Sequence, residues 1–300
     1  MNRCVRVAHV LGCFLLAQIA EAGTAVPMVF THRVPDAYNS GTASYEASVL
    51  KLALDKTIDE YGPYEFRVAP AMNITRSIQG MKSDSFPNLI VTLGYKDSYS
   101  ADGDIAYIRF PIDLGILGYR TCFAPKSMLG KISKINTLDE LRKLSIGQGR
   151  GWVDSAILKA NGFNVVEAEP YSILFKMTAA HRFDLFCRGA NEVKEEYDHW
   201  QDLDGFGYDR HLLIYYPMPI FFYTNTANTQ AIARVTKGLH KAYADGSLMA
   251  LWFERHKDSV NFANLGKRKV FRLENPMAKS VDFDYTRYFY NLNVNKYAQP

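Results

Sequence analysis

The segment Gly147–Trp152 alternates glycine with polar residues between a predicted strand and a predicted helix. Glycine allows backbone N–H groups to approach a ligand closely, and a helix N-terminus favours an anion. Arg150 adds a guanidinium, which suits a carboxylate or a phosphate. We therefore expect Gly149, Arg150 and Gly151 to bind an anionic group, although a tight strand-to-helix turn explains the spacing equally well. Trp152 is expected either to stack on the ligand or to lie as an apolar residue at the edge of its lobe.

A second arginine, Arg188, closes the apolar strand predicted over residues 183–187. Ligands of α/β sheets bind at the carboxyl ends of strands, so Arg188 is predicted to contact a ligand or the opposite lobe. The alternative is a structural salt bridge. Glu192 follows four residues later and could pair with Arg188 or contact the ligand. Glu192, Glu195 and Glu196 form a helical acidic cluster that is expected to face water.

Two further candidates are weaker. Arg120 lies at the end of a long extended stretch, and Tyr38 lies in the loop after the first predicted strand, where an aromatic side chain could cover a bound molecule.

Catalytic and cofactor motifs are missing from the sequence. The histidines are scattered, and neither a His-Glu-x-x-His nor a Gly-x-Ser-x-Gly pattern occurs. The glycine-rich segment lacks the fourth position of a dinucleotide loop and the Gly-Lys-Ser/Thr ending of a nucleotide-triphosphate loop. We therefore predict no catalytic residue, no metal and no cofactor.

Composition indicates an ordinary globular protein. The chain has 300 residues, of which 48% are hydrophobic and 22% charged, with a formal net charge of +4. No run of five or more Lys and Arg residues occurs, whereas nucleic-acid binders concentrate positive charge in patches. Nucleic acid is therefore not an expected partner.

The N-terminus has the pattern of a secretory signal peptide. Arg3 and Arg6 precede an apolar stretch over residues 10–20, and small residues at Ala20 and Ala22 place the cleavage after Ala22. The apolar stretch is too short to span a bilayer, which needs about 20 residues. We therefore predict a signal peptide over residues 1–22 and a periplasmic, exported protein.

Removal of this signal peptide takes away Cys4 and Cys13. The mature chain keeps Cys122 and Cys187, which form either one disulfide or two buried thiols.

Strand and helix patterns alternate in two sets. The first set starts with a strand over residues 26–30 and an amphipathic helix over 47–61, and the second runs from the capping box Thr137–Glu140 to a helix ending at Trp200. Extended stretches at 105–124 and 212–224 separate them.

This order predicts an α/β clamshell with two extended hinge crossings. Lobe 1 is predicted over 23–118 and 217–300, and lobe 2 over 119–216.

This arrangement resembles the type II periplasmic solute-binding proteins, in particular those that bind amino acids and similar polar solutes. The likeness covers most of residues 26–257 and rests on the segments Ile112–Arg120, Ser145–Gly151 and His181–Gly189. The resemblance implies a protein that hands a solute to a membrane permease or senses it for a receptor.

Three positions depart from the amino-acid-binding pattern. The amino-acid binders grip the ligand carboxylate with a Thr…Arg element in lobe 1, where this chain offers only Lys96 as a nearby cation. Trp152 replaces a small hydroxyl residue, and Arg188 stands where an acidic residue often holds the ligand amine. The resemblance therefore does not imply a conventional α-amino acid as the solute.

We predict an exported, monomeric protein that closes on a small polar, anionic solute for uptake or sensing. The alternatives are an exported dehydratase-like enzyme on the same scaffold, or an accessory sensor protein that docks to a membrane receptor.

Overall fold

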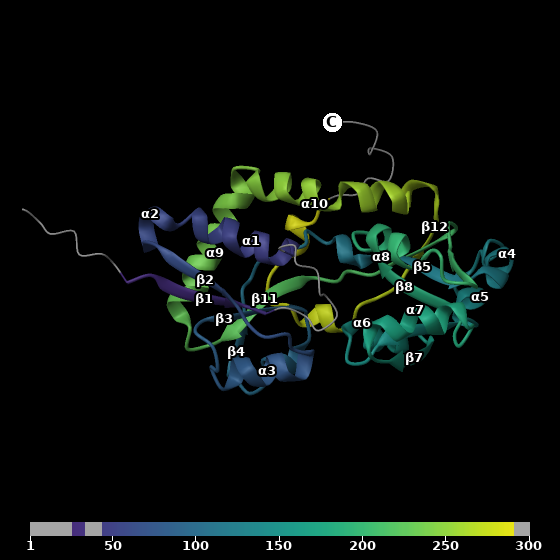
Figure 1. The fold of residues 1–300 in the computed structure, drawn as a ribbon, viewed down its shortest axis with the longest axis horizontal. Helices are drawn as coiled ribbons and strands as arrows, with labels where there is room; N and C mark the ends of the chain where they lie inside the picture. Colours follow the sequence, from purple (N-terminus) through teal and green to yellow (C-terminus); the bar gives the residue numbers. More distant parts are fainter. Residues whose placement is uncertain (1–25, 34–43, 291–300) are drawn as a thin grey trace, which may run out of the picture.

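The computed structural model describes residues 26–33 and 44–290. The predicted signal peptide (1–22) and Tyr38 lie outside the described residues. Figure 1 shows two α/β lobes side by side along the long axis of the molecule. Within the described ranges, no helix is both long enough and apolar enough to cross a membrane.

Lobe 1 is a sheet with the strand order β2-β1-β3-β11-β4, covered by helices. Its strands are β1 (Met28–His32), β2 (Tyr64–Val68), β3 (Leu89–Gly94), β4 (Ile105–Tyr107) and β11 (Ile220–Asn225). Its helices are α1 (Tyr45–Asp55), α2 (Ile58–Tyr61), α3 (Ile74–Lys82) and α9 (Thr229–Ala244). Strands β1, β2 and β3 are parallel, and β11 runs antiparallel to β3 and β4.

The predicted helix over residues 47–61 is divided into α1 and α2. The hydroxyl of Thr57 donates to the carbonyls of Ala53 and Leu54, and these bonds compete with the helical pattern at that point. The apolar face of α1 packs against α9.

Lobe 2 is a second sheet with the strand order β12-β10-β5-β8-β6-β7, in which β9 also pairs with β5. Its strands are β5 (Tyr119–Pro125), β6 (Ser145–Gly149), β7 (Asn164–Ala168), β8 (Leu185–Gly189), β9 (Phe206–Tyr208), β10 (Leu212–Tyr215) and β12 (Lys269–Arg272). Its helices are α4 (Leu129–Ile132), α5 (Leu138–Arg142), α6 (Val153–Ala160), α7 (Tyr171–Ala179) and α8 (Val193–Trp200). The predicted capping box is confirmed: the side chains of Thr137 and Glu140 each accept a backbone N–H of the other residue.

The two predicted crossings connect β4 to β5 and β10 to β11. The first is held by Asp113, whose buried carboxylate accepts the N–H groups of Gly115 and Leu117 at 3.3 and 3.2 Å. Burial raises the pKa of the Asp113 carboxyl to about 7.

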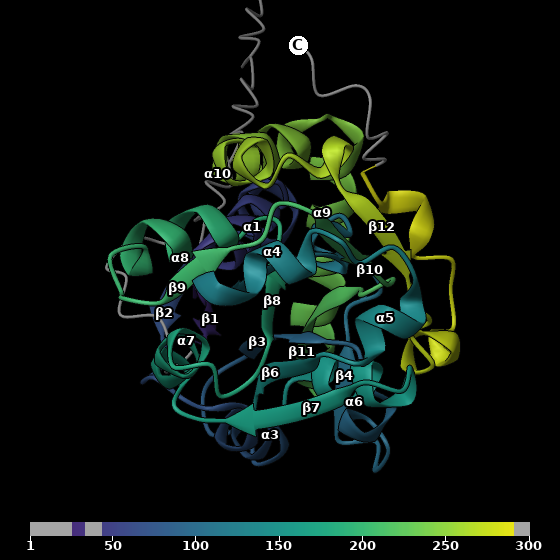
Figure 2. The same cartoon turned by 90° about the vertical axis from the view of Figure 1, so that its right-hand side faces the viewer.

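Helix α10 (Ser247–Ala263) and the segment after it cross between the lobes again. Helix α10 contacts α1 and α9 in lobe 1 and α8 in lobe 2 (Figures 1 and 2). Strand β12 then pairs with β10 in the sheet of lobe 2, although residues 217–300 were predicted for lobe 1. The chain returns to lobe 1, where Tyr288 packs on Phe110 and the N–H of Tyr290 donates to the carbonyl of Leu114.

A disulfide joins β5 to β8 in the middle of lobe 2. Cys122 and Cys187 are directly opposite in the antiparallel register, and both are buried. The bond links positions 65 residues apart in the sequence. The structure therefore decides between the two states that the sequence left open.

Replacing both cysteines by alanine should lower the free energy of unfolding by about 3–4 kcal/mol, because the crosslink restricts a long loop of the unfolded chain. Urea unfolding of the oxidised parent and of the double variant measures this difference. Dithiothreitol should bring the parent close to the variant and leave the variant unchanged. Equal urea midpoints without reductant would contradict the assignment.

Candidate functional site

The glycine-rich segment forms a tight connection between β6 and α6. Gly151 has a φ of 77°, a conformation that favours glycine, and the N–H of Trp152 donates to the carbonyl of Gly149. A Cβ atom at Gly149 would lie 2.2 Å from the Trp152 indole. Gly149 is therefore needed for the close approach of Trp152 itself.

The start of α6 lies at the contact between the two lobes. A Cβ atom added to Gly94, at the end of β3 in lobe 1, would lie 3.3 Å from a methyl of Val153 and 3.0 Å from the Cε methyl of Met218. Trp152 directly precedes Val153, so its backbone lies beside this contact, and its half-buried indole packs on Arg188 and Phe186 of lobe 2. We call Trp152 and Val153 the interlobe wall of lobe 2. Within the described part of the chain, the N–H groups of Val153 and Asp154 form no hydrogen bond, as expected at a helix start.

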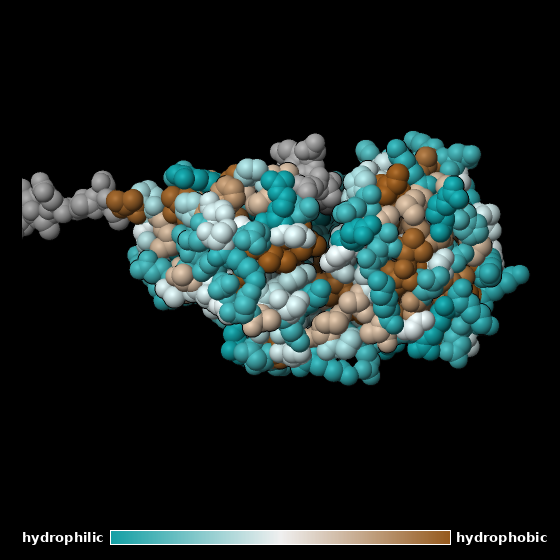
Figure 3. All heavy atoms as spheres, turned by 90° about the horizontal axis from the view of Figure 1, so that it is seen from below, coloured by the Kyte–Doolittle hydropathy of each residue, from teal (hydrophilic) through white to brown (hydrophobic). Residues whose placement is uncertain are grey.

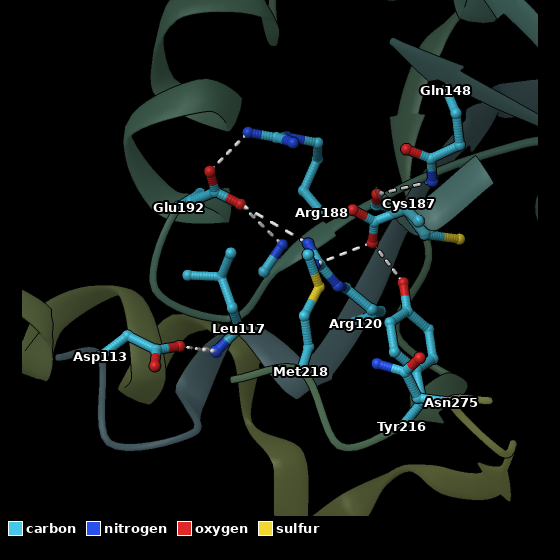
Figure 4. Close-up of polar contacts among 12 residues, drawn as sticks. Asp113, Leu117, Arg120, Gln148, Cys187, Arg188, Glu192, Tyr216, Met218 and Asn275 are labelled. Carbon is cyan, nitrogen blue, oxygen red and sulfur yellow. Dashed lines mark hydrogen bonds and ion pairs between the residues drawn. The ribbon is translucent and has the colours of Figure 1, made fainter. Parts of the chain in front are cut away.

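Arg188 is buried between aromatic rings and carboxylates. Its Nε donates to Glu196 at 2.8 Å. A terminal nitrogen donates to Glu192 at 2.6 Å (Figure 4). Its guanidinium carbon lies 4.6 Å from the centre of the Trp152 ring and 5.4 Å from that of Tyr171. Arginine stacks well on aromatic faces while its edge donates hydrogen bonds. The sequence left two roles open for Arg188, and its ion pair with Glu192 is observed.

A second buried arginine adjoins the first. Arg120 lies 2.8 Å from Asp154 and 3.9 Å from Glu192, and its guanidinium also contacts the sulfur of Met218 (Figure 4). The hydroxyl of Tyr216 donates to Asp154. Glu192 is therefore shared between the two arginines, and its other contact is the N–H of Gly189.

We call the residues Arg120, Asp154, Arg188, Glu192 and Glu196 the ion-pair network. Two guanidiniums face three carboxylates, so the network carries no excess positive charge. Burial raises the pKa of the Glu196 carboxyl to about 7, even though the nearby Arg188 opposes the shift. Protonation of Glu196 would make the network neutral.

The expectation that Glu196 faces water is wrong. Its side chain is 4% exposed, and it accepts hydrogen bonds from Arg188 and Tyr171. Sequence reasoning also missed Asp154, Tyr171 and Tyr216 as members of this region. The available signal was the spacing of Glu192 and Glu196, because residues four apart lie on the same face of a helix, whereas Arg188 lies in β8 before that helix.

The other predicted site residues lie apart from the ion-pair network. Arg150 is exposed and pairs with the exposed Glu169 at 3.2 Å. Lys96 follows β3 in lobe 1, and its ammonium lies 5.8 Å from the centre of the Tyr99 ring. Among the described residues, no group of three or more His, Cys, Asp or Glu side chains could hold a metal ion.

Comparisons with known proteins identify the fold. No protein-family model matches the sequence, and no curated protein matches it. Solved structures do match. An amino-acid ABC transporter substrate-binding protein from Streptococcus pneumoniae bound to L-arginine is 12% identical, with a TM-score of 0.57, and the match covers 77% of this chain and 95% of that one. The fold is that of the type II periplasmic binding proteins.

Two other structures with this fold are a ligand-binding core and a periplasmic domain. The GluR0 ligand-binding core in complex with L-glutamate is 9% identical with a TM-score of 0.58, covering 78% of this chain and all of that one. The periplasmic VFT2 domain of BvgS from Bordetella pertussis is 13% identical with a TM-score of 0.55, covering 76% of this chain and 93% of that one. At these identities the likeness establishes the two-lobed fold alone.

The Arg188→Met variant should lose about 3 kcal/mol of folding free energy, because two carboxylates near the removed guanidinium stay buried. The Arg150→Met variant should lose less than about 1 kcal/mol, since its ion pair is exposed. Urea unfolding at neutral pH compares the two. Similar losses in both variants would contradict a buried ion-pair network.

The raised pKa of Glu196 predicts a pH dependence of stability. Between its usual value of 4.5 and about 7, the folded protein binds this proton and the unfolded chain releases it. Glu196 should therefore contribute a fall of about 3 kcal/mol in the free energy of unfolding as the pH rises through this window. The buried His32 and His256, whose pKa burial lowers to about 4, contribute a rise over part of the same window. Glu196→Gln should remove only the fall due to Glu196 and leave the contributions of Asp113 and the two histidines.

Glu195→Gln is the matched control, because Glu195 is the exposed neighbour on the same helix. It should keep the pH dependence of the parent. Urea midpoints measured across the window test both variants, and a parent profile retained in Glu196→Gln would contradict the assignment.

Proposed function

We propose that this protein is an exported, monomeric solute-binding protein that holds one small polar solute between its two lobes. The observation that carries the proposal is the position of the N-terminus of α6 beside lobe 1, with Trp152 directly before it. The N–H groups of Val153 and Asp154 at this helix start remain available as hydrogen-bond donors. Figure 3 shows the surface hollowed between the lobes, with apolar residues inside the hollow. Solutes in two-lobed proteins bind at such interfaces between domains.

The ion-pair network bears on the charge of the solute. The prediction of an anion rested mainly on Arg188 and Arg150, with Arg120 in support. Arg188 and Arg120 are compensated by carboxylates, and Arg150 is paired with Glu169. We therefore propose a solute without net negative charge, which places an apolar or planar part on Trp152 and a polar acceptor at the N-terminus of α6.

Binding is favoured over catalysis by the burial of the titratable groups. Glu196 has the raised pKa expected of a catalytic acid, but its side chain is 4% exposed beneath Arg188 and Tyr171. A general acid must reach the atom that it protonates. The periplasmic partner, a permease or a sensory receptor, would receive the solute-bound form.

Binding can be tested by thermal shift and by isothermal titration calorimetry with a panel of neutral polar solutes, zwitterions, carboxylates and phosphate. A neutral or zwitterionic solute should bind with 1:1 stoichiometry, and Trp152→Ala should weaken it at least about tenfold through loss of the stacking surface. Trp200→Ala is the control, since Trp200 stacks on Phe175 within lobe 2.

An unchanged affinity in Trp152→Ala would remove this residue from the site. Binding of simple carboxylates or phosphate alone would overturn the proposed charge of the solute. Consumption of the solute during the titration would favour the enzyme alternative.

A further inference from the structure

The far end of lobe 2 gathers exposed cations from three separate parts of the chain. Lys131 and Lys134 belong to α4 and the turn after it, and Arg210 precedes β10. Lys267 ends the 3-10 turn before β12, and Lys269 is the first residue of β12. We call these five residues the basic end. All five side chains are exposed.

Backbone contacts bring these segments together around His211. Its ring nitrogen contacts the carbonyl of Ile135 at 2.7 Å, and its own carbonyl accepts the N–H of Lys269 at 2.7 Å. Lys134 and Arg210 are direct sequence neighbours of the two contacting residues. Figures 1 and 2 agree, with α4, α5 and β12 at the same end of lobe 2.

The positive charge of the basic end is not compensated within the described residues. None of its five side chains forms an ion pair there, whereas Arg268, between Lys267 and Lys269, is buried and paired with Asp209. The carboxylates of the adjacent α5 are engaged elsewhere: Asp139 pairs with Arg142, and Glu140 accepts the N–H groups of the capping box. Clustered like charges repel one another, so contact with an anionic surface lowers the electrostatic free energy of the protein.

We propose that the basic end docks the protein on an anionic phospholipid surface. Its composition favours lipid over a protein partner, because lysine is depleted from protein–protein interfaces while aromatic residues and methionine are enriched there. Four of the five residues are lysines, and among the described residues the only large exposed hydrophobic side chain beside them is that of Val270, at 36% exposure. Lysines near a membrane attract anionic headgroups electrostatically and need no apolar anchor.

This docking leaves the interlobe wall accessible. The basic end lies on α4, β10 and β12, whereas Trp152 and Val153 lie at the contact with lobe 1. The proposal is therefore independent of the proposed solute, and either one can fail without the other.

The test is co-sedimentation with vesicles of phosphatidylglycerol and phosphatidylcholine, compared with vesicles of phosphatidylcholine alone. The parent protein should bind only the anionic vesicles. Binding should weaken steeply between about 0.01 M and about 0.15 M salt, as the Debye length falls from about 30 Å to about 8 Å.

Two quadruple variants distinguish the effect of the basic end from the effect of the net charge of the protein. The first replaces Lys131, Lys134, Lys267 and Lys269 by Glu, and keeps Arg210 because it packs over Tyr208 and Phe262. The second makes the same change at four exposed cations elsewhere, Lys51, Arg76, Lys176 and Arg182. At about fivefold per basic residue, the first variant should lose at least about a hundredfold in vesicle affinity, and the second should keep most of it.

Circular dichroism and thermal melting check the fold of each variant, and a Gln series replaces any Glu variant that misfolds. Loss of anionic-vesicle binding in the basic-end variant alone supports the proposal. The proposal is overturned if the parent protein does not bind anionic vesicles or binds both kinds of vesicle equally. It is also overturned if the two variants lose vesicle affinity to the same extent. Binding to duplex DNA or an acidic polypeptide without vesicle binding would also overturn it.

Discussion

The ion pair that Glu192 makes with Arg188 holds the interlobe wall of lobe 2 in place. Glu192 directly precedes the first residue of α8, and its carboxylate connects that helix to the end of β8 and, through Arg120, to β5. Arg188 in turn supports the indole of Trp152, which lies on Gly149 of β6. Removing one member of such a buried set leaves uncompensated charge, so the wall depends on all of them together.

The same network changes what the wall offers to a solute. A guanidinium that is already bonded to carboxylates supplies little attraction to a further anion, because its charge is neutralised locally. The apolar face of Trp152 and the backbone donors of α6 remain as the recognisable features. The same two-lobed fold can therefore present a different surface between its lobes without a change in the arrangement of its strands.

The two lobes are connected by further contacts in addition to the two crossings. Helix α10 packs on both lobes, β12 belongs to the sheet of lobe 2, and the side chain of Asn275 then donates to the carbonyl of Pro217 in the second crossing. Asp113 fixes the first crossing through two N–H groups, and Trp252 of α10 donates to its carbonyl. Relative movement of the lobes must therefore be absorbed by the short segments between these contacts.

The sequence by itself determined the alternating elements and the two crossings, because periodicity and capping are local properties. It left open whether Glu192 pairs with Arg188 or contacts a ligand. It could not place Asp154 beside Arg120, bury Glu196, or put β12 into the sheet of lobe 2, since these contacts join residues far apart in the chain. Nor could it choose between a disulfide and two thiols, which required the register of β5 against β8. Only the tertiary structure decided which arginines are paired with carboxylates. The free energy of a charged side chain depends on how deeply it is buried and on which groups surround it, and both are set by contacts between distant parts of the chain.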